Sequence, residues 1–109
     1  MRKLRFTTFL RLVTAGNLVA VKWALFYDSA DDLDSKVPHH YPAHRKRVDE
    51  WHANGKLLAA GTFGDPQTEG AMCLFATRED AEEFAREDPF VLGGVVRAWR
   101  VFRWDEIEW

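Results

Sequence analysis

The sequence is almost without cysteine, because Cys73 is the single one in 109 residues. An internal disulfide needs two cysteines and a thiolate metal cage needs several, so neither can form within one chain. We therefore expect the protein to work in a reducing compartment, the cytoplasm. Cys73 lies in the apolar run Ala71–Phe75, where a buried, inert thiol is expected rather than a nucleophile.

Long apolar runs are also missing. Residues 1–20 combine basic residues and threonines with an apolar stretch that Arg11 interrupts. What remains is shorter than the roughly 20 residues that a membrane span needs, so no membrane partner is expected. We interpret residues 1–20 as a non-core N-terminal extension. A weak basic targeting segment and a mis-assigned upstream start codon are the alternatives.

Clustered basic charge is scarce in the remainder of the chain. Four of the fifteen Lys and Arg residues lie in residues 1–20, which hold no acidic residue, and this leaves eleven basic against seventeen acidic residues from residue 21 onward. Proteins that bind nucleic acid non-specifically depend on clustered Lys and Arg. The acidic body therefore argues against a nucleic-acid partner.

The residues that are present are those of one folded domain. Apolar residues make up 47% of the chain and charged residues 29%, with five Trp and eight Phe. This composition supplies enough apolar surface to offset the entropy of ordering the chain. A chain of this length has room for one core, and we place the domain at residues 21–109.

The first half of the domain predicts a strand followed by a helix. Residues 22–27 are apolar and aromatic, which is typical of a buried strand. The helix is expected to begin near Pro42, since proline suits a first helical turn, and to end at Asn54-Gly55. Within it, His44, Val48 and Trp51 recur at helical spacing and form one face.

The second half predicts two paired strands, a second helix and a last strand. Residues 56–63 and 70–76 read as strands joined by a hairpin loop at 64–70. Thr77 is a good N-cap for a helix that Pro89 ends, and residues 95–104 alternate as a strand does.

The order strand, helix, strand, strand, helix, strand indicates an α+β fold, a ferredoxin-like βαββαβ sandwich. Its four-stranded antiparallel sheet would carry both helices on one face. The other face would then be bare and apolar, and exposed patches of that kind usually mark an association surface. We therefore expect a homodimer that forms through the sheet face.

Five segments resemble the YCII-related family, a branch of the dimeric α/β-barrel superfamily with ferredoxin-like protomers. They cover most of residues 22–104 in the family's order, and they are Trp23–Tyr27, Pro42–His44, Leu58–Asp65, Glu87–Phe90 and Val101–Trp104. The resemblance implies that this chain is a dimeric α/β barrel.

The resemblance also implies a catalytic pair. The family's histidine and aspartate, which face each other across a pocket as an acid/base pair, correspond to His44 and Asp88. An imidazole titrates near pH ~6.5, and a carboxylate can orient it and stabilise its charged form. The alternative is that His44 is an ordinary helix-face histidine and Asp88 caps a turn. Many members carry an arginine shortly before the histidine, where this chain has Tyr41.

Four further residues are candidates for ligand binding: Gly61, Phe63, Pro89 and Phe90. Gly61 would let a ligand approach the strand backbone, or it marks a β-bulge. Pro89 and Phe90 would shape the wall of the pocket, or they pack onto the core as a proline-aromatic turn.

No metal or cofactor is expected. His39, His40, His44 and His52 lie close together in the sequence, but Pro42 interrupts the helical spacing of His40 and His44, and His52 has no matching carboxylate. Phosphate-binding glycine loops, nucleophile elbows and dinucleotide fingerprints are absent from the sequence.

These observations leave two hypotheses about function. The first is a small cofactor-independent enzyme, a lyase, isomerase or dehydratase-like catalyst, that moves a proton on a small organic substrate with His44 and Asp88. The second is a non-catalytic, ligand-binding or accessory dimeric module that uses the same cleft. A hydrogen-bonded His44–Asp88 pair inside an open pocket would favour the first.

Overall fold

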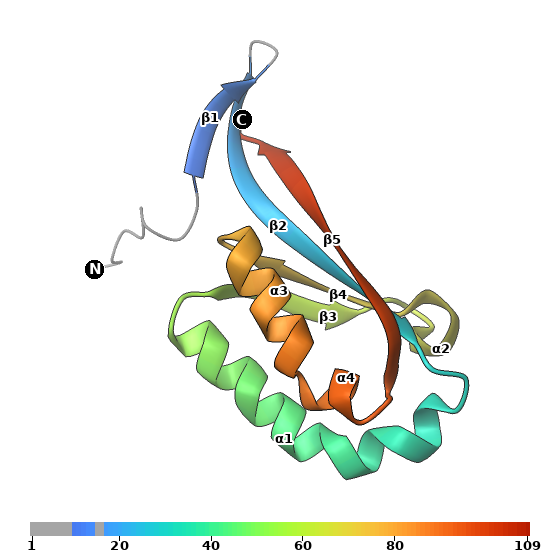
Figure 1. The fold of residues 1–109 in the computed structure, drawn as a ribbon. Coiled ribbons are helices and arrows are strands. Elements are labelled where there is room, and N and C mark those ends of the chain that lie inside the picture. The colour runs from blue at the N-terminus through green and yellow to red at the C-terminus, as the bar shows by residue number, and fades with distance from the viewer. Residues whose placement is uncertain (1–9, 15–16) are drawn as a thin grey trace.

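The computed structural model describes residues 10–14 and 17–109 of the chain (Figure 1). Within these ranges the elements follow the predicted order, preceded by one additional strand. In chain order they are β1 (Leu10–Thr14), β2 (Asn17–Ser29), α1 (Leu33–Ala53), β3 (Leu57–Thr62), α2 (Pro66–Glu69), β4 (Ala71–Phe75), α3 (Arg78–Glu87), α4 (Pro89–Leu92) and β5 (Val96–Ile107).

The sheet has the strand order of a ferredoxin-like fold. β2 pairs with β4 on one side and with β5 on the other, and β3 pairs with the far side of β4. All these pairings are antiparallel, so the four main strands lie in the order β5-β2-β4-β3. The predicted α+β fold is confirmed.

The main core lies between one face of the sheet and the helices α1 and α3. Phe75 of β4 and Phe84 of α3 are fully buried, and their ring centroids are 5.3 Å apart. Trp51 of α1 packs edge-on against both, at 6.2 and 5.2 Å. Edge-to-face aromatic contacts at these distances add to the stabilisation from burial. Because α1 and α3 share this cluster, they cover the same face of the sheet.

Helix α1 begins earlier than the sequence predicts, and this expectation was wrong. It starts at Leu33 rather than near Pro42, so Pro38 and Pro42 lie inside it. Proline removes a backbone hydrogen bond and usually bends a helix, and α1 is visibly bent in Figure 1. No side chain of α1 is fully buried. No helix in the described ranges is long and apolar enough to cross a membrane.

Two short helices replace predicted turns, and both begin with Asp-Pro. Asp65 accepts a hydrogen bond from the Gln67 backbone at the start of α2, and Asp88 accepts one from the Phe90 backbone at the start of α4. Aspartate is a preferred N-cap, and proline fits the first helical position because the amide it lacks would be unpaired there. Asp88 also terminates α3, so it lies at the junction of two helices.

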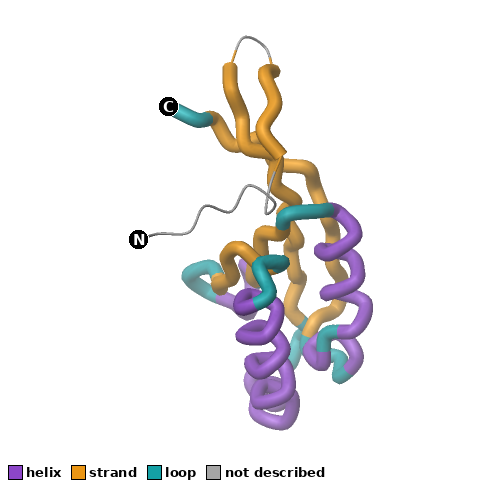
Figure 2. The backbone as a smooth tube through the Cα atoms, turned by 90° about the vertical axis from the view of Figure 1, so that its left-hand side faces the viewer, coloured by secondary structure: helices purple, strands orange, loops and turns teal. Residues whose placement is uncertain are grey.

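The strands extend beyond the part of the sheet that the helices cover. β1 forms a hairpin with β2, and the last part of β5 runs beside them (Figure 2). Residues 1–9 and 15–16 of the predicted N-terminal extension lie outside the described residues. The predicted domain boundary at residues 20 and 21 falls inside β2, and both Ala20 and Val21 are buried.

Candidate active site

The side chains of His44 and Asp88 meet between α1 and the α3–α4 junction. His44 Nδ1 lies 2.8 Å from Asp88 Oδ1, although the two residues are 44 positions apart. The Asp88 side chain is fully buried, whereas the His44 side chain keeps 15% of its surface exposed. The imidazole therefore connects a buried carboxyl group to solvent.

Asp88 is surrounded by hydrogen-bond donors. Besides the contact with His44, its Oδ1 accepts from the Phe90 backbone amide at 3.0 Å, and its Oδ2 accepts from the Tyr27 hydroxyl at 2.6 Å. An ionised carboxylate is purely an acceptor, so three donors satisfy the ionised form of Asp88. This network assigns the proton of His44 to Nδ1, which leaves Nε2 of a neutral ring free to accept a proton.

Tyr27 is held as a protonated donor by its surroundings. Its side chain is 5% exposed, near the C-terminal end of β2. Burial, followed by the negative charge of Asp88, raises the pKa of the Tyr27 phenol well above its usual range. The phenol therefore keeps its proton and donates it to Asp88.

Aromatic rings fix the plane of the His44 imidazole. Phe90 stacks flat on it, with centroids 3.8 Å apart and an interplanar angle of 5°. Tyr41 lies at a tilt to both rings, with centroids 6.3 Å from each. With Asp88 holding one edge and Phe90 one face, the imidazole has little freedom to rotate.

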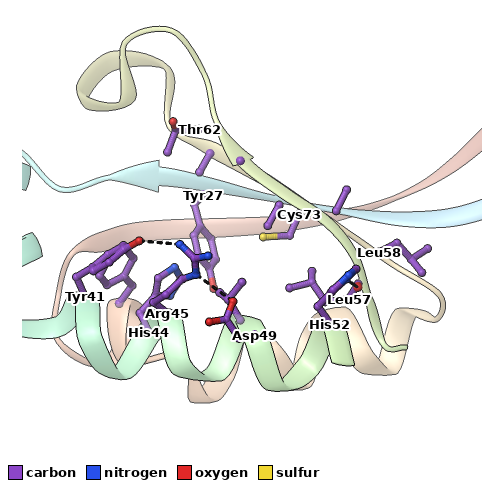
Figure 3. A pocket seen from close by; sticks show the side chains of 16 residues that line it. Tyr27, Tyr41, His44, Arg45, Asp49, His52, Leu57, Leu58, Thr62 and Cys73 are labelled. Atoms are coloured by element: carbon purple, nitrogen blue, oxygen red, sulfur yellow. Dashed lines mark hydrogen bonds and ion pairs between the residues drawn. The ribbon is translucent and has the colours of Figure 1, made fainter. Parts of the chain in front are cut away.

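A pocket of about 430 Å³ opens beside His44, between α1 and β3 (Figure 3). This volume is in the range typical of small-molecule sites. The walls are mostly apolar, with polar side chains on the α1 side; the lining residues are Tyr27, Tyr41, His44, Arg45, Val48, Asp49, His52, Leu57, Leu58, Ala59, Ala60, Gly61, Thr62, Ala71, Cys73 and Phe90.

Arg45 brings a permanent positive charge to the pocket. Its Nη1 donates to the Tyr41 hydroxyl at 3.2 Å, and its Nε donates to Asp49 at 3.0 Å (Figure 3). These two hydrogen bonds, first of all the one donated to Tyr41, raise the pKa of the Arg45 guanidinium above its ordinary value.

The candidate ligand-binding residues are divided between the two faces of the sheet. Gly61 and Phe90 line the pocket, and a Cβ atom added to Gly61 would meet nothing within 4 Å. Phe63 stacks with Phe26 on the open face, 6.4 Å between centroids, and is not among the lining residues. Pro89 is the first residue of α4 and does not line the pocket either.

Sequence reasoning missed Tyr27 and Arg45. Tyr27 ends the predicted first strand, and nothing in its aromatic neighbourhood separates a site residue from a core residue. Arg45 belongs to the short charged run Arg45-Lys46-Arg47, and such a run is typical of a solvated helix face rather than of a binding site. Cys73 also lines the pocket, where burial raises the pKa of its thiol to about 12.

No group of three or more metal-ligating side chains occurs among the described residues. The four histidines illustrate this: His44 contacts Asp88, His52 Nδ1 lies 2.9 Å from the Leu57 carbonyl, and His39 and His40 contact each other edge-on. His44 and Asp88 form a hydrogen-bonded pair, and His44 lines the pocket.

The opposite face of the sheet is apolar and open. Phe63, Phe102 and Trp104 are 40%, 50% and 44% exposed there. Phe26 contacts Phe63 and Phe102, and a smaller pocket of about 340 Å³ lies beside them.

Comparison with known proteins gives a family and a structural neighbour. The family model of the YCII-related domain matches residues 21–105. A solved structure of 5-chloro-2-hydroxyhydroquinone dehydrochlorinase (TftG) from Burkholderia phenoliruptrix AC1100, in complex with 2,5-dihydroxybenzoquinone, is similar in fold. The TM-score is 0.60 at 20% identity, over 76% of this chain and 92% of that one. No curated protein matches the sequence.

Proposed function

The chain belongs to the YCII-related family, and from this premise we propose that it is a small cofactor-independent enzyme of the lyase, isomerase or dehydratase-like kind. In this proposal His44 transfers a proton on a small organic substrate, and Asp88 orients the imidazole. The observation that carries the proposal is the 2.8 Å contact between His44 Nδ1 and a fully buried carboxylate, at the wall of an open pocket.

The proposed reaction begins with His44 as a general base. Nδ1–H donates to Asp88, so Nε2 takes a proton from an acidic C–H or O–H of the substrate, and the resulting imidazolium is stabilised by the carboxylate. The same imidazolium then returns the proton to another atom of the substrate or to a leaving group. Tyr27 supports the carboxylate from behind through its 2.6 Å hydrogen bond.

The pocket favours a planar substrate. Phe90 and Tyr41 supply aromatic surface next to His44. The opposite side of the pocket is lined by the small residues Ala59, Ala60 and Gly61. The structural neighbour binds a hydroxylated quinone, so hydroxylated quinones and related cyclic compounds are the first class to test.

A screen followed by isotope exchange tests this proposal. Cyclic metabolites, lactones and hydroxyquinones are screened by thermal shift, since ligand binding raises the melting temperature. Compounds that bind are incubated in D₂O, and deuterium incorporation and product formation are followed by NMR. The wild-type protein should catalyse exchange or turnover of at least one of them.

Replacing the proposed base should abolish this catalysis. We expect His44→Gln to slow exchange or turnover by about 10² to 10⁴, the usual contribution of a general base. His39→Gln, on the exposed side of the same helix, is the matched control and should keep wild-type rates. Binding without exchange or turnover in the wild type would instead assign the pocket to a non-catalytic ligand-binding module.

We further propose that the protein acts as a homodimer, joined through the open face of the sheet, in the cytoplasm. Phe63, Phe102 and Trp104 form a cluster of exposed aromatic side chains with Phe26 on that face, with Arg100 over the Phe26 and Phe102 rings, and exposed apolar clusters usually mark association sites. The buried free thiol of Cys73 suits a reducing compartment. Light scattering should give twice the chain mass of 12.6 kDa at micromolar concentration, and a monomer there would contradict the proposal.

A further inference from the structure

We propose that Arg45 makes the pocket selective for small planar organic anions, with the anionic group bound by Arg45 and Tyr41 beside His44. This inference rests on the proposed function, because it concerns the ligand of the same pocket. It names the charge and shape of the ligand, neither of which the His44–Asp88 pair defines.

The guanidinium of Arg45 has donors to spare. It carries five N–H groups, of which Nε–H is used by Asp49 and one Nη1–H by Tyr41. Among the described residues it has no other hydrogen-bond acceptor, so one N–H on Nη1 and both on Nη2 remain for a ligand. Guanidinium groups bind carboxylates and other two-oxygen anions through two parallel hydrogen bonds.

Tyr41 adds a further donor at the same point. Its hydroxyl oxygen accepts from Arg45 Nη1, so its own proton is free to be donated. Figure 3 shows the Tyr41 hydroxyl and the Arg45 guanidinium next to each other on the pocket side of α1, adjacent to His44. An anion bound here would therefore lie beside the proposed base.

The exposed carboxylate of Asp49 competes only weakly with a ligand for the Arg45 guanidinium. Asp49 contacts Nε and leaves the outer edge of the guanidinium open, and the side chains of Arg45 and Asp49 are 59% and 62% exposed. Ion pairs with that exposure contribute little. The other carboxylate, Asp88, is buried beneath His44 with its own three donors.

The remaining walls select for shape rather than charge. The opposite wall, Ala59–Thr62, carries no charged side chain. The ring of Phe90, already stacked on His44, continues towards Tyr41 as an aromatic surface. A flat ring with an acidic substituent matches this arrangement: the ring faces the apolar walls, and the charged edge meets Arg45.

The experiment compares 4-hydroxybenzoate with 4-hydroxybenzamide, which have nearly the same shape but differ in charge. A second pair, the ionised form of 2,5-dihydroxybenzoquinone and its neutral dimethyl ether, distinguishes an acidic ring hydroxyl from a carboxylate. Affinities are measured by NMR titration. The wild type should bind the anion of at least one pair about tenfold or more tightly than its neutral partner, as expected for a charge-assisted hydrogen bond.

Three variants assign the preference to Arg45. Arg45→Gln should reduce it to about twofold or less, whereas Lys46→Gln, which removes the neighbouring charge outside the pocket, should leave it intact. Asp49→Asn should strengthen anion binding by a few fold, because it removes the competing carboxylate. Equal binding of anion and neutral partner by the wild type, a preference that survives in Arg45→Gln, or no binding by either pair would overturn the inference.

The two proposals fail separately. If the anion site is correct but the proposed catalytic activity is not, the wild type prefers anions and no bound ligand exchanges a proton in D₂O. If the enzyme holds but the inference does not, exchange is lost in His44→Gln and neutral compounds bind as well as anions. Binding by His44→Gln with the wild-type preference would show that the anion contact is independent of the base.

Discussion

At the scale of single residues, Asp88 carries three tasks at once. It ends α3, begins α4 and accepts hydrogen bonds from His44 and Tyr27. Burying a carboxylate is costly unless its oxygens are fully paired, and all three neighbours supply donors. The fold therefore depends on the same network that orients the proposed base.

Removing one of these donors should destabilise the protein. Tyr27→Phe leaves Asp88 Oδ2 without its 2.6 Å partner, and an unpaired buried acceptor costs about 1 to 3 kcal/mol. We expect the free energy of unfolding in urea to fall by that amount. Tyr41→Phe is the matched control, since its hydroxyl is at the exposed end of the pocket, and its effect should be about 0.5 kcal/mol or less. Equal effects of the two variants would contradict the assigned role of Tyr27.

Tyr27 also predicts how stability changes at alkaline pH. Its pKa is raised in the folded state above the ordinary value of about 10, so the unfolded state loses the phenolic proton first. Stability from this group is complete below about pH 10 and decreases as the pH rises further. In a Tyr41→Phe background, absorbance at 295 nm should show no tyrosinate until the protein unfolds. Tyrosinate formation in the folded protein near pH 10 would refute the prediction.

At the scale of elements, the sequence predicted most of the fold and part of the site. The aromatic strand at 22–27, the hairpin around 64–70 and the last strand are local patterns, and each lies within an observed element or turn. His44 and Asp88 were found through the family resemblance. Arg45 and Tyr27 were not, because their roles depend on which side of α1 faces β3 and on the contact of β2 with the α3–α4 junction, neither of which local periodicity encodes.

The start of α1 was mispredicted because proline was taken as a boundary. The helix continues through Pro38 and Pro42, and tertiary contacts of its ends outweigh the local penalty. One such contact is Lys36 Nζ to the Gly94 carbonyl, at 3.3 Å. Local preference is a weak guide wherever long-range contacts are available.

Pro38 should therefore lower the stability of α1. Pro38→Ala should restore a backbone hydrogen bond to the Asp34 carbonyl and raise the free energy of unfolding by about 1 kcal/mol. The gain is smaller than the full helix-interior penalty, because proline also restricts the unfolded chain. Pro66→Ala is the control. Pro66 is the first residue of α2, where proline is favourable, so no gain is expected. A loss of stability in Pro38→Ala would contradict this explanation.

At the scale of the whole molecule, the sheet separates two surfaces with different properties. One face carries the helices and the pocket, and the other carries the apolar surface around Phe26 and Phe102. If that surface joins two copies, a charge placed on it should separate them.

Phe102→Glu tests this directly. Phe102 is half-exposed on the open face, and burying a carboxylate there in an interface would be unfavourable even with Arg100 beside it, because the desolvation cost can exceed the gain from an ion pair. We expect the mass in light scattering to fall from dimer to monomer at micromolar concentration. Leu92→Glu introduces the same charge on α4, at a residue that is 72% exposed on the helical side, and should leave the mass unchanged. A dimer that persists in Phe102→Glu would place the interface elsewhere.

The position of the pocket on the helical side of the sheet has a consequence for how such a pair would respond to substrate. In two copies joined through their open faces, both pockets would face away from the interface. Each pocket would be open to solvent, and neither would be covered by the other copy. Ligand-binding curves should then be hyperbolic, with a Hill coefficient of about 1, because a ligand in one pocket contacts no residue that lines the other pocket. Dissociation of the dimer would leave the affinity of each chain for its ligand unchanged.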